Sequence, residues 1–160
     1  SIFMKKINFL MKLKNEDKIK IVEPSNEIKN SYIIKSESSF KSAEILIKNN
    51  QIEDAVSLIY YSMYYLVTAL LFKIGIKCKN HSATIIILLE LLEIDNSSII
   101  FAKNERVDKQ YNIDFKITKE EVLEMFEIGK KFNFKIYDFI DRLTTKKCNE
   151  YLNEFRGAIF

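Results

Sequence analysis

The chain has 160 residues, of which 48% are hydrophobic and 29% are charged, which excludes a disordered chain and is enough for a buried core. Lysine and arginine exceed aspartate and glutamate by 25 − 22 = 3, an excess too small to argue for nucleic-acid binding by itself. Three glycines and one proline leave little turn chemistry for an all-β fold, so the composition favours helices joined by short loops.

Residues 1–22 carry a weak apolar pattern and are predicted to be an N-terminal extension, followed by a single helical domain over residues 23–160. The extension has six lysines against two acidic residues, so it either contacts an anionic partner or remains a solvated end. Its lysines interrupt the apolar run that a signal peptide would need. A cytoplasmic location is therefore expected.

An amphipathic helix is predicted to begin at Ser25, which follows Pro24 and can cap the free amides of a first helical turn. Apolar residues recur along one face of the stretch that follows, at Ile28, Tyr32, Phe40, Ala43 and Ile47. The break at residues 49–51 is short, so the next helix should lie antiparallel beside this one.

The stretch from Ile52 to Ile76 is predicted to be the central helix of the fold, because apolar residues cover nearly all of its sides. Between residues 55 and 72 its hydrophilic breaks, apart from tyrosine hydroxyls, are Ser57, Ser62 and Thr68. Such a helix must be surrounded by other helices or lie in a membrane. Its uncharged core is at the lower length limit of a span, and its tyrosines lie in the middle rather than at the ends, so a buried core helix is favoured and no membrane is expected.

A third helix is predicted to begin at Asn80 or Ser82, after a turn at Gly75 and a compact loop. The β-branched run at residues 84–87 would also suit a strand, but a strand without a partner is costly. A fourth, shorter helix is predicted around Ile99–Gln110.

A long fifth helix is predicted to open at Thr118, where a threonine and Glu121 have the spacing of a capping box. Its apolar stripe continues to Leu143. A last amphipathic segment follows, which either closes the bundle or meets a second subunit.

Metal and cofactor chemistry find no support in the sequence. Cys78 and Cys148 are far apart, and His81 is the single histidine, so a zinc site is not predicted. A Gly-rich phosphate loop is also missing. No metal and no cofactor are expected.

Three passages resemble one protein family in their order and spacing. They are VEPSNEIKNSYIIKSESSFKSAEILIKNNQIEDA at residues 22–55, EDAVSLIYYSMYYLVTALLFKIGIKCKNHSA at residues 53–83 and NERVDKQYNIDFKITKEEV at residues 104–122. They resemble, in turn, the opening helix pair, the tyrosine-rich helix with its Gly turn and His-containing loop, and the Arg-and-Tyr passage of HEPN-domain proteins. The resemblance is to the small stand-alone HEPN proteins of archaea and bacteria.

This resemblance implies an all-α fold, an up-and-down bundle of four to five helices with an amphipathic C-terminal helix, commonly a homodimer. It also implies a role with RNA or a nucleotide, in a toxin–antitoxin system or beside a nucleotidyltransferase that would be the antitoxin partner. Active members of the family are metal-independent ribonucleases that carry an Arg followed, after four to six residues, by a His. In such a pair the Arg stabilises charge on a phosphate and the imidazole transfers protons near neutral pH.

Arg106 corresponds to the family's arginine, but Tyr111 or Asn112 stands where its histidine would be expected. On an ideal helix Arg106 and Tyr111 are 500° − 360° = 140° apart, so they are not expected on one face. The catalytic candidates are therefore Arg106 and His81. The structural alternatives are an ion pair of Arg106 with Glu105 or Asp108, and a loop histidine that caps the helix start or is hydrogen-bonded to a neighbour.

Aromatic residues supply most of the candidate binding residues, which are Tyr60, Tyr61, Tyr64, Asp108 and Tyr111. Phenol rings can stack on bases, although core packing with hydroxyls at its edge would use the same residues. The favoured function is binding of RNA or a nucleotide, with catalysis doubtful because the motif's histidine is missing. The alternatives are a metal-independent ribonuclease that uses Arg106 and His81, and a non-enzymatic helical dimer that binds a protein partner through residues 146–160.

Overall fold

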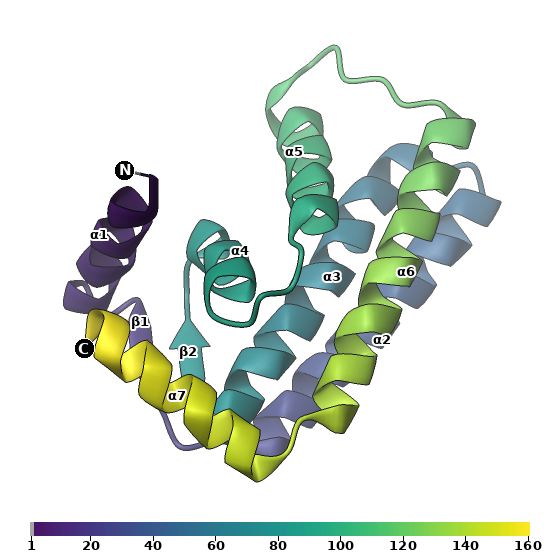
Figure 1. Ribbon diagram of the computed structural model, residues 1–160. Coiled ribbons are helices and arrows are strands. Elements are labelled where there is room, and N and C mark those ends of the chain that lie inside the picture. Colours follow the sequence, from purple (N-terminus) through teal and green to yellow (C-terminus); the bar gives the residue numbers. More distant parts are fainter. Residues whose placement is uncertain (1) are drawn as a thin grey trace.

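The computed structural model describes residues 2–160, which fold into seven helices and one small two-stranded sheet (Figure 1). The all-α fold expected from the sequence is confirmed. In chain order the elements are α1 (Ile2–Asn15), β1 (Ile19–Ile21), α2 (Asn26–Lys48), α3 (Ile52–Ile74), β2 (Ile76–Cys78), α4 (His81–Glu90), α5 (Ser97–Tyr111), α6 (Lys119–Arg142) and α7 (Thr145–Ile159).

Helix α3 is the centre of the bundle, as its apolar sequence predicts. It packs against α2 and α6, which run beside it, and against α5 and α4 on another side (Figure 1). Among residues 2–160 it is the one helix that is long and apolar enough to cross a membrane, and 67% of its most apolar stretch is buried by the rest of the chain. That burial is the burial of a core helix, so the apolar residues of α3 are accounted for by packing against its neighbours.

Local capping signals set the helix starts. The Ser25 hydroxyl accepts a hydrogen bond from the backbone N–H of Ile28, and Thr118 and Glu121 form the reciprocal bonds of the predicted capping box. Asn80, rather than Ser82, caps α4. Helix α3 ends at Gly75, whose φ of 107° is the left-handed conformation that glycine tolerates best.

The short sheet joins two parts of the chain that the sequence did not predict as strands. Strand β1, within the predicted extension, pairs antiparallel with β2, which follows Gly75 and was expected to be a loop. Ile19 lies opposite Cys78 and Ile21 opposite Ile76. Helix α1 adds Leu10 and Leu13 to the hydrophobic core.

Helix α7 closes the bundle at the end where α1 also lies (Figure 1). Its apolar residues Cys148, Phe155 and Ile159 are buried against the same chain. The predicted role of this segment in closing the bundle is therefore what the single chain shows.

Candidate functional site

The candidate site lies where α3 meets the start of α4 and the middle of α5. Strand β2 ends at Cys78, and the cap at Asn80 then begins α4 with His81 as its first residue. The Asn80 side chain accepts a hydrogen bond from Ala83 N–H at 2.9 Å, which fixes this first turn. The turn thereby places His81 against the tyrosines of α3.

His81 is held by two tyrosines of α3. Its Nδ1 atom is 2.8 Å from the hydroxyl oxygen of Tyr60, a hydrogen-bond distance. Its ring lies flat on Tyr64, with ring centroids 3.9 Å apart and an interplanar angle of 14°. The edge of the same ring faces Tyr61. These contacts fix both the position and the rotation of the imidazole.

Arg106 approaches the same tyrosines from α5. Its guanidinium carbon lies 4.9 Å from the ring centre of Tyr61 and 5.7 Å from that of Tyr60, which are cation–π distances. It forms no ion pair with Glu105, Asp108 or any other acidic residue of the described chain. The charge of Arg106 is therefore not neutralised by a carboxylate, and the structural alternative of an ion pair is not what the structure shows.

We call Tyr60, Tyr61, Tyr64, His81 and Arg106 the His81 cluster. The structure thus brings both catalytic candidates and three of the five binding candidates into one place. The other two lie elsewhere: Asp108 is exposed, and Tyr111 is 76% exposed at the end of α5.

Burial and positive charge set the ionisation of the cluster. Burial, followed by the charges of Arg106 and Lys103, lowers the pKa of His81, so the imidazole is neutral at pH 7. Burial raises the pKa of Tyr60 far above its ordinary value, and the phenol keeps its proton. Burial and then Arg106 also lower the pKa of Lys103.

Lys103 and Ser82 border the cluster and were not predicted as site residues from the sequence. The Lys103 ammonium donates a hydrogen bond to the Ser82 hydroxyl, which joins α5 to the first turn of α4. Lys103, Arg106 and Lys109 are three residues apart along α5, and Lys109 reaches Asp54 and Ser57 of α3. This i, i+3, i+6 spacing was the available sequence signal for a basic face directed at α3 and α4.

A half-buried aromatic row continues from the cluster along α3. Tyr61 stacks on Tyr65 with centroids 5.9 Å apart, and Tyr65 contacts Tyr32 of α2. The Lys35 ammonium lies over both of the last two rings, at 5.7 and 5.3 Å from their centres. Aromatic rings alternating with cations are a common surface for single-stranded nucleic acid.

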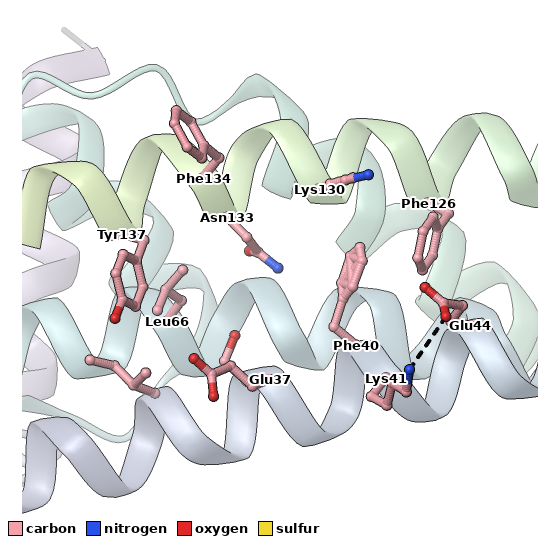
Figure 2. Close-up of a pocket in the computed structure, with 12 residues that line it drawn as sticks. Glu37, Phe40, Lys41, Glu44, Leu66, Phe126, Lys130, Asn133, Phe134 and Tyr137 are labelled. Atoms are coloured by element: carbon pink, nitrogen blue, oxygen red, sulfur yellow. Dashed lines mark ion pairs between the residues drawn. The ribbon is translucent and has the colours of Figure 1, made fainter.

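A separate groove lies between α2 and α6, with α3 as its floor (Figure 2). Its volume is about 430 Å³, and aromatic side chains such as Phe40, Phe126 and Tyr137 line it. At its floor Ser62 accepts a hydrogen bond from Asn133, while the Ser36 hydroxyl donates to the Ser62 carbonyl. This α2–α6 groove contains none of the residues predicted as catalytic or binding.

The two sites differ in the chemistry that they can support. The His81 cluster combines a neutral imidazole, a guanidinium without an ion-pair partner among residues 5–160, and a neighbouring ammonium, and this combination suits an anionic oxygen. Among residues 5–160 there is no group of three or more His, Cys, Asp or Glu side chains that could hold a metal ion.

Comparison with known proteins adds a family to this geometry. A family model described as "HEPN domain" matches residues 30–133, which include every residue of the His81 cluster. A search of curated proteins finds no match.

Proposed function

Because this chain belongs to the HEPN family, we propose that it is a module that binds RNA or a nucleotide through the His81 cluster. The single observation that carries the proposal is the position of Arg106, which lies over two tyrosine rings without a carboxylate partner among the described residues. A guanidinium left in this way is suited to bind a phosphate oxygen. The partly buried rings of Tyr61 and Tyr65 offer neighbouring surfaces on which a base can stack.

The wider setting of this function is also a proposal and rests on the family. We propose a cytoplasmic homodimer that works in a toxin–antitoxin pair or beside a nucleotidyltransferase. Neither the dimer nor the partner is needed for the binding experiment, which uses the isolated chain.

The test is binding of a labelled single-stranded RNA, and separately of labelled ATP, to wild type and to Arg106→Ala. We expect the substitution to weaken binding by about ten- to a hundredfold, since a hydrogen bond to a charged group contributes roughly 1.5–3 kcal/mol. For RNA, loss of one phosphate contact should also lower the salt dependence, by about 0.7 in the slope of log K against log salt.

Arg142→Ala is the matched control, because Arg142 is an exposed arginine that pairs with Asp138 on α6. It removes the same charge from the chain without touching the His81 cluster. Equal weakening by the two substitutions would show a non-specific charge effect, and failure of wild type to bind either ligand at low salt would contradict the proposal.

A ribonuclease is the second candidate, because Arg106 and His81 both contact Tyr60 and Tyr61. It predicts cleavage of RNA without added metal, with the activity lost in His81→Ala. Binding is the better supported function, because Tyr111 and Asn112, at the motif's histidine position, are both exposed and are not part of this cluster.

A further inference from the structure

The hydrogen bond between Tyr60 and His81 contains one proton whose position decides what His81 can do. The Tyr60 hydroxyl oxygen and His81 Nδ1 are 2.8 Å apart, and Tyr60 is 0% exposed. A neutral imidazole carries a single N–H, either on Nδ1 or on Nε2. If Tyr60 donates its hydroxyl proton to Nδ1, the single N–H of the imidazole is on Nε2. If Nδ1–H donates to Tyr60, Nε2 carries no proton and can only accept.

The surroundings of Tyr60 favour donation by the phenol. Its hydroxyl forms a hydrogen bond with no residue of the described chain other than His81. If His81 were the donor, the buried phenolic O–H would have no acceptor, at a cost of about 1–3 kcal/mol. The raised pKa of Tyr60 keeps that proton on the phenol at neutral pH. Donation by Tyr60 satisfies both groups with one bond.

The second ring nitrogen of His81, Nε2, is not fully buried. Nε2 has no hydrogen-bond partner among residues 5–160, and it is not one of the two buried side-chain atoms that lack a partner there, Thr68 Oγ1 and Asn133 Oδ1. An unpartnered atom that is not buried is available to a ligand. Nδ1 is bonded to Tyr60 and one ring face lies on Tyr64, so Nε2 is the ring nitrogen left for a contact with a ligand.

We infer that Tyr60 is a positioning residue that holds His81 in the tautomer with its proton on Nε2, so that the imidazole donates to an oxygen of a phosphate group. The inference rests on the proposed function for the identity of the ligand. With Arg106 and Lys103 beside it, the cluster then presents hydrogen-bond donors to solvent, and a phosphate oxygen is an acceptor only. The phosphate is common to RNA and nucleotides. In this tautomer His81 is not a general base, because Nδ1 already accepts the proton of Tyr60.

The tautomer can be read directly, because His81 is the only histidine in the chain. Full-length protein with ¹⁵N-labelled histidine, studied by NMR at neutral pH without ligand, should show one imidazole with the proton on Nε2 and a hydrogen-bonded Nδ1. A proton on Nδ1 would overturn the role of Tyr60, whatever the protein binds.

Substitution of Tyr60 by phenylalanine gives opposite results for the two arrangements. If Tyr60 donates to Nδ1, the bond stabilises the neutral imidazole, so Tyr60→Phe should raise the pKa of His81 in the same NMR titration. If His81 donates, the substitution should lower that pKa, and the inference is overturned. Tyr64→Phe is the matched control, since Tyr64 stacks on the imidazole without a hydrogen bond to it, and the tautomer should not change.

The ligand part is tested with AMP and with adenosine, which differ by the phosphate. AMP should shift the Nε2 resonance of wild type while adenosine at the same concentration does not, and Tyr60→Phe should bind AMP roughly three- to tenfold more weakly. Binding of AMP without a shift of Nε2 would overturn the contact with phosphate. If neither AMP nor a single-stranded RNA binds, the phosphate assignment fails together with the proposed function, and the tautomer result still decides the role of Tyr60.

Discussion

Two opposite sides of α3 use polar side chains in different ways. Tyr60 and Ser62 are two residues apart, which is about 200° around the helix, so one faces α4 and α5 and the other faces α2 and α6. On the first side lie His81 and Arg106. On the second side lie Ser36, Asn133 and the floor of the α2–α6 groove.

The difference between the two sides is where the polar atoms find their partners. On the groove side, the Ser62 hydroxyl donates to the Ile59 carbonyl and accepts from Asn133, so its hydrogen bonds stay within the bundle. On the cluster side, Nε2 of His81 and the guanidinium of Arg106 have no hydrogen-bonded or ion-paired partner among residues 5–160. Polar groups with internal partners stabilise the fold, whereas groups left with free donors are available for binding.

The largest expected effect separates two adjacent tyrosines on the cluster side. Tyr60 is fully buried and Tyr61 only partly, so Tyr60→Ala should destabilise the protein by about 3–5 kcal/mol and Tyr61→Ala by less than half of that. Urea denaturation of both variants measures the difference. If Tyr60→Ala does not fold, Tyr60→Leu and Tyr61→Leu should keep the same order. Equal losses would mean that the cluster is not anchored by Tyr60.

A smaller effect is expected on the groove side. Ser62→Ala removes the hydroxyl to which Asn133 donates through Nδ2, and the Oδ1 atom of Asn133 is already buried without a partner. The substitution should therefore lower the free energy of unfolding by about 1–2 kcal/mol. Asn133→Leu removes both polar atoms of that side chain and keeps its size, so it should be close to neutral. Denaturation curves for the two variants give the comparison. A larger loss for Asn133→Leu than for Ser62→Ala would contradict this account of the groove floor.

Neither substitution on the groove side should change the binding of RNA or nucleotide. A binding defect in Ser62→Ala as large as that of Arg106→Ala would remove the distinction between the two sides of α3. The measurement is the same binding assay, made at a temperature at which all variants are folded.

The helices were predictable because their signals are local. Ser25, Gly75 and the Thr118 capping box mark helix ends within a few residues, and the structure places the ends there. The pairing of β1 with β2 was not predictable, because three-residue strands far apart in the chain have no periodic pattern of their own. The predicted loop after Gly75 becomes a strand because β1 supplies the partner.

The site was predictable in its residue types and not in its arrangement. The local sequence does not determine which helix is faced by each of Tyr60, Tyr61 and Ser62. That depends on where α4 and α5 pack against α3. The helical spacing did indicate that Arg106 and Tyr111 would not share a face, and the structure places Arg106 on the tyrosine rings with Tyr111 exposed. The placement of His81 against the tyrosines that Arg106 also contacts depends on the cap at Asn80, which sets the first turn of α4.

The smallest expected effect is a pH dependence that belongs to the cluster side alone. The titratable groups around His81 are Tyr60, Tyr61 and Tyr64 on α3, and Lys103 and Arg106 on α5. Burial and then the charges of Arg106 and Lys103 lower the pKa of His81 in the folded protein. As the pH falls through about 6.5, the unfolded chain therefore takes up a proton before the folded chain does, and the free energy of unfolding decreases.

We expect this decrease between about pH 7 and pH 5.5 in wild type, and a smaller one in His81→Gln, whose amide can still accept from Tyr60. Asn133→Leu should keep the wild-type dependence, because the groove-side chain of Ser36, Ser62 and Asn133 contains no titratable group. Urea denaturation at each pH measures the slope. An unchanged slope in His81→Gln would show that the imidazole titrates in the folded protein as it does in the unfolded chain, and the cluster would then lack the burial and positive charge on which its phosphate-binding role depends.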